Sequence, residues 1–273
     1  MPDHFVPGRF SGHVAIVTGS SADPSIGRAC AMRLGREGAA VVINGRDAER
    51  LGATAAALAD LEISVAAVGG SMEDDTTAHA LVEAARERFG GVDLVVNTIG
   101  GTRAPGSVES LDKSAWLDTI ALNTWPTIAL VKAALSDGLA ARHGAVVNIS
   151  SGSPKKTTPT MIAYAAAKAA LNALTRTMAA DLGSLGVRVN AVSPGLTKTT
   201  ATGPMWRDDD GRSAGANLLL GSLTEAEDIA AAVAFLLSSD ARQITGVVLD
   251  VDGGNHLGGG GWTPITAPPP PTP

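Results

Sequence analysis

The amino-acid sequence predicts an α/β fold: a single-domain, doubly wound parallel sheet of about seven strands with helices on both faces. Seven short runs rich in Val, Ile and Ala lead to this prediction, because they are apolar almost throughout instead of alternating with polar residues. Continuous apolar runs are typical of strands that are covered on both faces. Longer Ala-rich stretches of helical length separate the runs. Strands that alternate with helices form a parallel sheet with right-handed crossovers.

The predicted elements follow one another at regular intervals. The expected strands are 13–18, 40–44, 63–68, 93–97, 144–150, 187–192 and 247–251, and the expected helices are 25–37, 47–61, 74–89, 112–138, 160–184 and 224–238. Residues 199–222 show no helix or strand period, and loops of that length in a compact domain are usually lids or binding loops. We therefore expect one domain at 1–257, which includes this lid, and a flexible Gly/Pro-rich tail at 258–273.

The composition limits the classes of protein and site that fit this chain of 273 residues. Its 45% hydrophobic content is too high for a disordered protein, while no apolar run approaches the ~20 residues of a membrane span. The net charge of −6 argues against nucleic acid as a partner. A single cysteine, Cys30, and five scattered histidines give no basis for a disulfide framework or a metal site, and the N-terminus lacks an apolar signal stretch. We expect a cytoplasmic protein without a membrane, nucleic-acid or metal partner.

The first predicted strand ends in a glycine-containing turn that leads into the first helix. Glycines in such a turn let backbone amides approach a pyrophosphate at the N-terminus of the helix. A tight turn with a serine as the helix N-cap would leave the same pattern. The turn residues that we expect to contact a cofactor are Thr18, Gly19, Ser20, Ser25, Ile26 and Gly27.

The second predicted strand ends in Asn44-Gly45-Arg46, which bears on the choice of cofactor. An acidic residue at this point binds the ribose hydroxyls of NAD, whereas an arginine accommodates the 2′-phosphate of NADP. No acid stands at the strand end, and Asp47 is interpreted as the N-cap of the next helix. The sequence therefore favours NADP(H) over NAD(H), and a solvated Arg46 is the alternative interpretation.

The middle of the chain carries four polar residues at a specific spacing. Tyr164, the only tyrosine, and Lys168 are four residues apart in an Ala-rich helix, so they share one helix face. Ser151 lies thirteen residues before Tyr164 and directly follows a predicted strand, and Asn123 lies in the preceding helix. Each residue alone could serve packing or solvation, but the set points to catalysis.

The chain resembles the short-chain dehydrogenase/reductase family over roughly residues 11–256, and within it the NADP(H)-dependent 3-oxoacyl-(acyl-carrier-protein) reductase-like carbonyl reductases. The resemblance rests on the four residues above and on several shorter motifs. These are Thr18-Gly19 with Ser25-Ile26-Gly27, Asn97-Thr98-Ile99-Gly100, Pro194-Gly195-x-x-x-Thr199, Thr245-Gly246 and Asp252-Gly253-Gly254. The resemblance implies a Rossmann-like fold and hydride transfer between a nicotinamide and a carbonyl or secondary alcohol.

The resemblance also implies a role for each residue. Tyr164 is then the general acid in reduction and the base in oxidation, and Ser151 hydrogen-bonds the substrate oxygen. Asn123 positions a water that relays protons to Lys168. An ammonium about 4 Å from the phenol would lower its pKa from ~10 toward neutrality. The implied cofactor-binding residues are Thr18, Gly19, Ser20, Ser25, Ile26, Gly27, Asn44, Arg46, Ser71, Asn97, Gly100, Tyr164, Lys168, Pro194, Gly195, Thr197 and Thr199.

Departures from the family pattern leave alternative functions open. The first turn is longer than usual, and its Ser25-Ile26 resembles the enoyl-acyl-carrier reductases of the same superfamily. Those enzymes place their tyrosine seven residues before the lysine, where this chain has Met161. Ser71 stands near the place where the family usually presents an aspartate to the adenine. The alternatives are a 2-enoyl thioester reductase and a non-catalytic dinucleotide-binding regulator.

Three cations and two helices bear on the expected partners. Arg103, Lys155 and Lys156 are expected at the rim of the substrate cleft, either to steer an acidic substrate or as ordinary solvated charges. The substrate is expected to be a small carbonyl or alcohol, acyl thioesters included. The family resemblance implies a homotetramer or homodimer that forms through helices 112–138 and 160–184.

Overall fold

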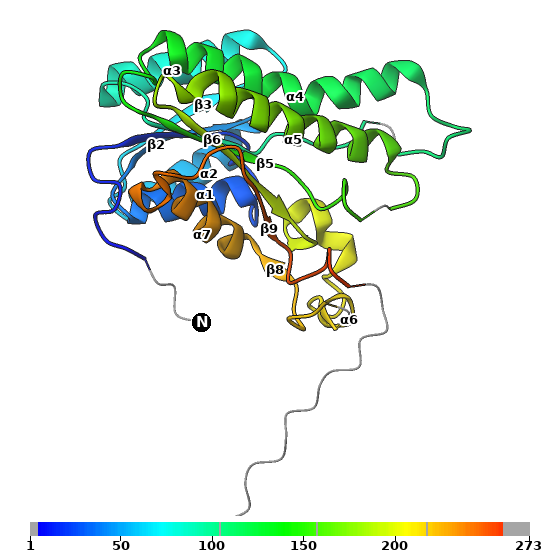
Figure 1. Ribbon diagram of the computed structural model, residues 1–273. Coiled ribbons are helices and arrows are strands. Elements are labelled where there is room, and N and C mark those ends of the chain that lie inside the picture. Colours follow the sequence, from blue (N-terminus) through cyan, green and yellow to red (C-terminus); the bar gives the residue numbers. More distant parts are fainter. Residues whose placement is uncertain (1–4, 104, 157, 217, 259–273) are drawn as a thin grey trace, which may run out of the picture.

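A parallel sheet of seven strands forms the centre of the computed structural model, which describes residues 5–103, 105–156, 158–216 and 218–258 (Figure 1). The strands are β1 (Val14–Val17), β2 (Ala40–Gly45), β3 (Val65–Gly69), β4 (Leu94–Asn97), β5 (Ala145–Ile149), β6 (Arg188–Pro194) and β9 (Val248–Val251). Their order in the sheet is β3-β2-β1-β4-β5-β6-β9, and every pair is parallel. The predicted doubly wound sheet is therefore confirmed, whereas the predicted tail lies outside the described residues from position 259 onward.

Helices cover both faces of the sheet (Figure 1). On one face lie α1 (Ile26–Arg36), α2 (Ala48–Ala59) and α7 (Ala226–Leu237), and on the other lie α3 (Asp75–Phe89), α4 (Lys113–Ser136) and α5 (Ile162–Gly183). Helices α1 and α7 pack against each other, and so do α4 and α5. Within the described ranges, no helix combines the length and the apolar character that crossing a membrane requires.

Capping side chains explain where several helices begin. Ser25 accepts a hydrogen bond from the amide of Arg28 at the start of α1, and Asp47 accepts one from the amide of Arg50 at the start of α2. These bonds satisfy amides that the first helical turn leaves unpaired. Helix α7 begins two residues later than predicted, because residues 224–225 form the short strand β8 (Thr224–Glu225).

Strand β1 shows how the sequence builds the core on both faces of the sheet. Val14 and Ile16 join the apolar cluster under α3, α4 and α5, whereas Ala15 and Val17 join the cluster under α1 and α7. Successive side chains of a strand point to opposite faces, so a strand that is covered twice needs a continuous apolar run. The same alternation fixes which way each strand end points at the site.

Residues 199–222 contain two short helices that the sequence pattern did not predict. They are η1 (Thr200–Met205) and α6 (Arg212–Gly215), and a third short helix, η2 (Ser239–Ala241), follows α7. Strand β7 (Thr197–Lys198) pairs with β8, which brings the two ends of the segment together. Helices of one or two turns carry too little periodicity to be recognised in a sequence.

The crevice that positions the site lies at the carboxyl ends of β1 and β4. Strand β1 pairs with β2 on one side and with β4 on the other, so the chain crosses over in opposite directions from this point. In open α/β sheets, ligands bind where the strand order reverses.

Candidate active site

A cavity of about 410 Å³ opens at this crevice, over the ends of β1, β2, β3 and β4. It is referred to below as the dinucleotide cavity. Residues of the loop after β4 and of the turn after β1 line this cavity. Five of the predicted cofactor residues line it: Gly19, Asn44, Arg46, Ser71 and Gly100. The fold thus brings together residues from four separate segments of the chain.

The turn after β1 lets a ligand approach the backbone closely. Gly19 has a φ of +65°, and a Cβ at this position would lie 2.3 Å from Thr98 Oγ1. A Cβ on Gly27 would lie 2.4 Å from the Gly19 carbonyl oxygen. Neither position accommodates a side chain, so the backbone can pass directly beside a pyrophosphate at the start of α1. The turn therefore fits a dinucleotide.

Asn44 and Arg46 differ in position at the end of β2. Asn44 is buried, and its Nδ2 donates to the carbonyls of Val68 and Gly70, so it ties β2 to the end of β3. Arg46 is exposed and lines the dinucleotide cavity. Asp47 caps α2, as predicted. The charged side chain that the end of β2 presents to the cavity is thus an arginine.

Several predicted cofactor residues are parts of the scaffold around the cavity and do not line it. Thr18 and Ser20 are buried, and their hydroxyls donate to backbone carbonyls of β4 and β1. Asn97 is also buried, and its Nδ2 donates to Asn148 Oδ1 at 2.9 Å. These bonds fix the ends of the two central strands. Ser25, Ile26 and Gly27 form the N-cap and the first residues of α1.

The predicted nicotinamide-side segment begins at the end of β6. The Pro194 carbonyl accepts a hydrogen bond from the Gly152 amide at 3.0 Å, and the Gly195 amide donates to the Val251 carbonyl at 3.1 Å. The segment is therefore held between the loop after β5 and strand β9.

The same segment continues into η1 and reaches the first turn. Thr197 and Thr199 are both buried. The amide of Thr200 donates to the Pro24 carbonyl at 2.9 Å, which joins the start of η1 to the turn after β1. The structure thus places Thr199 beside the predicted pyrophosphate turn.

Tyr164 and Lys168 lie one turn apart on α5. Lys168 Nζ lies 5.8 Å from the centre of the Tyr164 ring and donates to the Ile149 carbonyl at 2.9 Å. Ser151 follows β5, and its hydroxyl lies close enough to the Tyr164 phenol to act on the pKa of this group. A Cβ on Gly100 would lie 2.6 Å from Lys168 Nζ. The three predicted side chains therefore meet beside the dinucleotide cavity.

The ionisation of Tyr164 differs from the expectation. Burial raises the pKa of Tyr164, and the nearby Ser151 hydroxyl offsets only part of this effect. Burial also lowers the pKa of Lys168 to about 8, because this side chain is only 2% exposed. Exclusion of water disfavours the charged form of both groups. The prediction that the lysine lowers the phenol pKa toward neutrality is therefore wrong for the protein on its own.

Asn123 is buried on α4 and holds the loop that follows β4. Its Oδ1 accepts a hydrogen bond from the Gly101 amide at 3.1 Å, and its Nδ2 donates to the carbonyls of Gly101 and Thr119, each at 2.7 Å. A Cβ on Gly100 would lie 2.5 Å from Asn123 Oδ1. Asn123 Oδ1 and Lys168 Nζ thus lie on the same side of Gly100, where its Cβ would stand. The Asn123 side chain supports the wall of the cavity.

The three cations predicted at the rim are paired with other side chains. Arg103 Nη2 lies 2.6 Å from the Glu73 carboxylate, and both residues line the dinucleotide cavity. Lys155 bonds Asp250, and Lys156 Nζ donates to an asparagine oxygen after β9 at 2.6 Å. All three residues are exposed, and each is paired with a side chain of the protein.

Ser153 is a polar residue at the site that the sequence analysis did not single out. Its Oγ lies 3.0 Å from Ser151 Oγ, and its amide donates to Ser151 Oγ at 3.1 Å. The sequence could have indicated this residue, because Ser153 follows Ser151 by two positions and serines commonly hydrogen-bond a nearby backbone group in turns.

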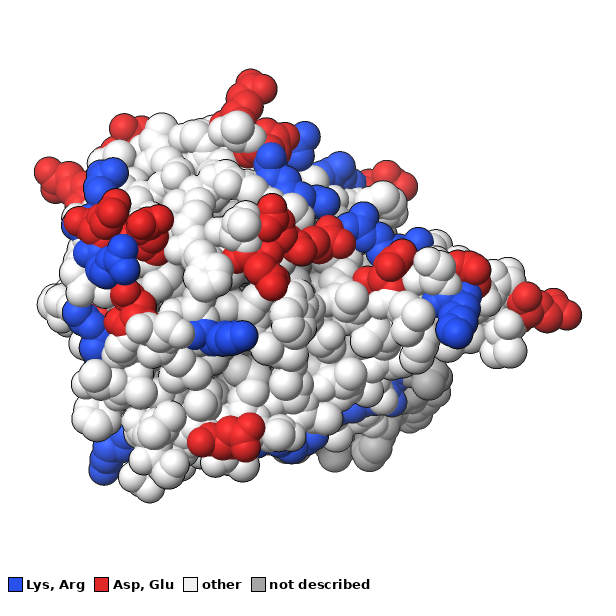
Figure 2. All heavy atoms as spheres, turned by 90° about the horizontal axis from the view of Figure 1, so that it is seen from above, with Lys and Arg blue, Asp and Glu red and all other residues white. Residues whose placement is uncertain are grey.

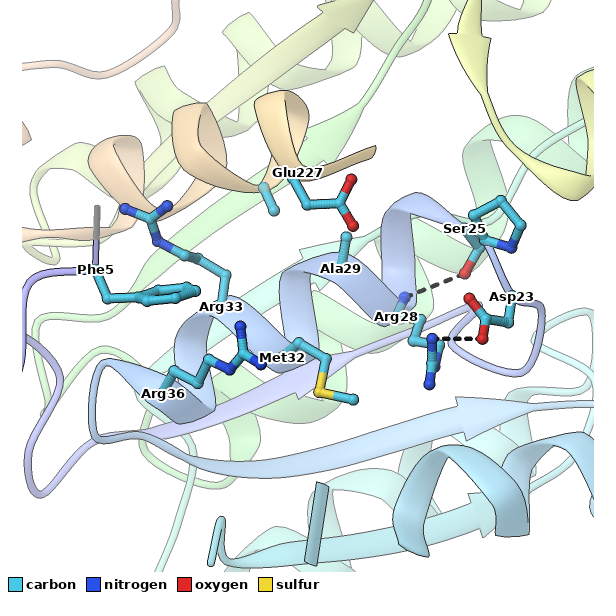
Figure 3. Close-up of a pocket in the computed structure, with 11 residues that line it drawn as sticks. Phe5, Asp23, Ser25, Arg28, Ala29, Met32, Arg33, Arg36 and Glu227 are labelled. Atoms are coloured by element: carbon cyan, nitrogen blue, oxygen red, sulfur yellow. Dashed lines mark hydrogen bonds and ion pairs between the residues drawn. The ribbon is translucent and has the colours of Figure 1, made fainter. Parts of the chain in front are cut away.

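A separate cavity of about 220 Å³ lies along the outer face of α1, between α7 and Phe5 (Figure 3). Arg28 pairs with Asp23 at 2.6 Å, and the guanidinium groups of Arg33 and Arg36 lie over the Phe5 ring. The cations of this cavity are thus engaged by the protein itself.

Metal ligands do not gather in the part of the chain that the structure describes: no group of three or more His, Cys, Asp or Glu there could hold an ion. Cys30 is a buried free cysteine on α1. Burial raises the pKa of its thiol.

Known proteins are similar in sequence to this chain over most of its length. A family model described as "Enoyl-(Acyl carrier protein) reductase" matches residues 19–256. A probable short-chain type dehydrogenase/reductase of Bradyrhizobium diazoefficiens is 37% identical over 250 residues, which cover 90% of this chain and 88% of the relative. The 3-oxoacyl-[acyl-carrier-protein] reductase FabG of Haemophilus influenzae is 34% identical over 246 residues, 90% of this chain and 99% of the relative.

A steroid dehydrogenase and a solved structure extend the likeness. The 3beta-hydroxysteroid dehydrogenase 1 of Eggerthella lenta is 35% identical over 250 residues, which cover 90% of this chain and 94% of the relative. A crystal structure of a short-chain dehydrogenase/reductase from Caenorhabditis elegans, determined with cofactor, has a TM-score of 0.84 at 30% identity and covers 92% of this chain and 98% of its own. This chain belongs to the short-chain dehydrogenase/reductase family of NAD(P)-binding oxidoreductases.

Proposed function

We propose that the protein is an NADP(H)-dependent oxidoreductase that transfers a hydride between the nicotinamide and a carbonyl or secondary alcohol. The observation that carries the proposal is the contact of Ser151 with the Tyr164 phenol, with Lys168 at 5.8 Å from the same ring, beside the dinucleotide cavity. Two relatives are named as a 3-oxoacyl reductase and a 3beta-hydroxysteroid dehydrogenase, and both names describe oxidoreduction at a carbonyl or hydroxyl carbon.

The site residues divide the work of carbonyl reduction. The bound nicotinamide supplies the hydride for the carbonyl carbon. Tyr164 donates its phenolic proton to the carbonyl oxygen, so that a C–H and an O–H bond form as the C=O π bond breaks. Ser151 is placed to hydrogen-bond the same oxygen and to stabilise the charge that develops on it. The raised pKa of Tyr164 keeps the phenol protonated at neutral pH, which is the state a general acid needs.

Lys168 is suited to restore the proton that Tyr164 has given. Its Nζ lies against the same ring and is held by the Ile149 carbonyl. A pKa of about 8 lets this lysine exchange protons near neutral pH, which a solvated lysine at ~10.4 does less readily. In alcohol oxidation the same groups act in reverse, with Tyr164 as the base.

The preference for NADP(H) rests on the end of β2. Arg46 lines the cavity there, and Ser21 and Ala22 of the first turn line it as well. A Cβ on Gly45 would lie 2.5 Å from Ser21 Cβ, so an acidic side chain could not replace this glycine without moving the turn. A cation at this position attracts a 2′-phosphate, and no carboxylate at the strand end repels one.

A 2-enoyl thioester reductase is the second candidate. The description of the matching family model and the Ser25-Ile26 turn favour it. The position of the tyrosine opposes it, because Tyr164 lies four residues before Lys168, and Met161 occupies the position seven residues before it.

We further propose that residues 199–222 act as a lid and that α4 and α5 form the interface of a homodimer or homotetramer. The bond from Thr200 to the first turn ties the base of the lid to the cofactor site.

The proposed subunit interface rests on exposed apolar side chains of these two helices. Leu117 and Trp125 on α4 and Ile162 on α5 are large apolar side chains that are exposed in the single chain. The side of the molecule that α3, α4 and α5 cover has a broad area with few charged side chains (Figure 2). Size-exclusion chromatography coupled to light scattering measures the oligomeric state directly.

Nicotinamide absorbance tests the proposed reaction. NADPH and NADH are compared in parallel against ketones, β-ketoacyl thioesters, quinones and a 2-enoyl thioester. We expect NADPH to be oxidised by at least one carbonyl substrate and to be preferred over NADH. Turnover of the enoyl thioester alone would replace the proposal with the second candidate, and cofactor binding without turnover on any substrate would indicate a regulator.

A further inference from the structure

The loop that follows Ser151 is fastened to the C-terminal part of the described chain. Lys155 and Lys156 of this loop bond Asp250 and Asn255, which lie 95 and 99 positions away in the sequence. Residues 250–256, the end of β9 and the turn after it, are referred to below as the C-terminal turn. The contact connects the predicted substrate side of the site to the last part of the fold.

Lys155 and Asp250 form the charged part of this contact. Lys155 Nζ donates to Asp250 Oδ2. The Asp250 side chain is 17% exposed, and its Oδ1 is buried and has no hydrogen-bond partner among the described residues. His256 Nε2 lies 3.9 Å from the same carboxylate. A carboxylate this far removed from water needs a cation beside it, so the loss of Lys155 would leave Asp250 poorly compensated.

Loss of the hydrogen bond from Lys156 should disturb the loop less than loss of the Lys155–Asp250 pair. Lys156 Nζ donates to Asn255 Oδ1 at 2.6 Å, and Lys156 is exposed. The acceptor is a neutral amide, so the loss of this lysine leaves no uncompensated charge. Lys155 is therefore the residue on which the position of the loop depends.

Backbone bonds connect Lys155 to Ser151. The amide of Lys155 donates to the Gly152 carbonyl at 2.9 Å, and the amide of Gly152 donates to the Pro194 carbonyl at 3.0 Å. The amide of Ser153 donates to Ser151 Oγ at 3.1 Å. The loop is thus a compact turn, in which the direction of the Ser151 hydroxyl depends on an amide two residues from Lys155.

The C-terminal turn is a firm anchor for this loop. Asp252 Oδ2 accepts from the His256 amide at 2.9 Å and bonds the His256 ring at 2.8 Å, and Oδ1 accepts from the Gly254 amide at 3.0 Å. Burial acts to raise the pKa of Asp252, but the bonds from His256 and Gly254 outweigh it, and the pKa is lowered. A Cβ on Gly195 would lie 2.8 Å from Asp252 Cβ, so the turn also packs against the nicotinamide-side segment.

We propose that Lys155 is a positioning residue for the reaction: by pairing with Asp250, it holds the loop 152–156 so that the Ser151 hydroxyl faces the Tyr164 phenol. Lys155 acts through Ser151 and is not itself in contact with the reacting atoms. The proposal rests on the proposed function, in which Ser151 hydrogen-bonds the substrate oxygen. A small displacement of such a group lowers the rate strongly, because the reacting atoms must be aligned.

Substitutions of Lys155 test this role by kinetics. Lys155→Met removes the charge and keeps the length of the side chain, Lys155→Arg keeps the charge, and Lys113→Met at the exposed start of α4 is the matched control. We expect Lys155→Met to lower kcat about ten-fold or more while the Kd of NADPH stays within about two-fold of the wild type. Lys155→Arg restores most of kcat. A Lys155→Met enzyme with the kcat of the control variant would overturn the proposal.

Hydrogen exchange provides a readout that does not require turnover. Peptides that cover residues 151–156 should exchange faster in Lys155→Met than in the wild type, and Lys113→Met should leave them unchanged. Unchanged exchange in Lys155→Met would overturn the proposal even in a protein for which no substrate is found. Faster exchange together with an unchanged kcat would overturn it too, because the loop would then move without effect on Ser151. Absence of turnover in the wild type bears on the proposed function alone.

Discussion

Replacement of Asn123 by alanine gives a prediction whose size follows from the structure. The side chain is 1% exposed and makes three hydrogen bonds to the backbone of Gly101 and Thr119. A buried hydrogen bond contributes about 1 kcal/mol net, so Asn123→Ala should lower the free energy of unfolding by about 3 kcal/mol. In a domain of this size that corresponds to a Tm lowered by about 6–12 °C.

Thr124→Ala is the matched control on the same helix. Among the described residues, the hydroxyl of Thr124 donates only to the carbonyl of Ile120, one turn back along α4. Its loss should therefore change stability by no more than about 0.5 kcal/mol. Urea unfolding followed by circular dichroism measures both variants. Equal stability of Asn123→Ala and Thr124→Ala would show that Asn123 does not support the loop after β4. A Kd for NADPH that rises in Asn123→Ala would add that this loop shapes the dinucleotide cavity.

Three further predictions follow from single side chains. Arg46→Ala should raise the Kd of NADPH about ten-fold or more and leave that of NADH within two-fold. The reason is that one cation close to a 2′-phosphate of about −1.5 to −2 charge contributes about 2 kcal/mol even in water. Fluorescence titration measures both Kd values, and an equal loss of affinity for the two cofactors would refute the assignment of Arg46 to the 2′-phosphate. The pKa of Lys168 is about 8 in the folded protein and higher in the unfolded chain, so the folded state releases this proton first as the pH rises. The free energy of unfolding should therefore rise with pH between about 8 and 10.4 in the wild type and not in Lys168→Met. Urea unfolding at several pH values measures this, and parallel profiles for the two proteins would contradict it. Cys30 should react with a thiol reagent only after unfolding, because burial raises its pKa; rapid labelling of the native protein would show that α1 opens locally.

The sheet and the helix starts follow from local features of the sequence. The apolar run Val14–Val17 becomes a strand that is buried on both faces, because each side of it packs into a separate apolar cluster. Asp47 was predicted as an N-cap, and it accepts the amide of Arg50. Such features depend on residues within a few positions of one another, and periodicity and capping register them.

The partners of charged side chains did not follow from the sequence. Arg103 meets Glu73, and Lys155 meets Asp250, across 30 and 95 positions of the chain. The sequence placed these cations near the site, but the residues that pair with them lie on other elements. No spacing rule connects residues so far apart.

The pKa shifts of Tyr164 and Lys168 also could not be predicted from the sequence. A cation near Tyr164 was predicted to lower the pKa of the phenol, but burial raises the pKa of Tyr164 and lowers that of Lys168. The sign depends on how much water the fold excludes from both groups. The spacing of Tyr164 and Lys168 contains no information on that exclusion.

Tyr164→Phe tests the proposed chemistry most directly, because the chain has only one tyrosine and this change removes only the phenolic oxygen. Kd for NADPH and kcat with a carbonyl substrate are measured on the same preparation. Loss of a general acid lowers the rate by about 10²–10⁴-fold. We expect a loss of this size in kcat with the Kd of NADPH within about two-fold of the wild type. Turnover of Tyr164→Phe within ten-fold of the wild type would contradict the assignment of Tyr164 as the proton donor.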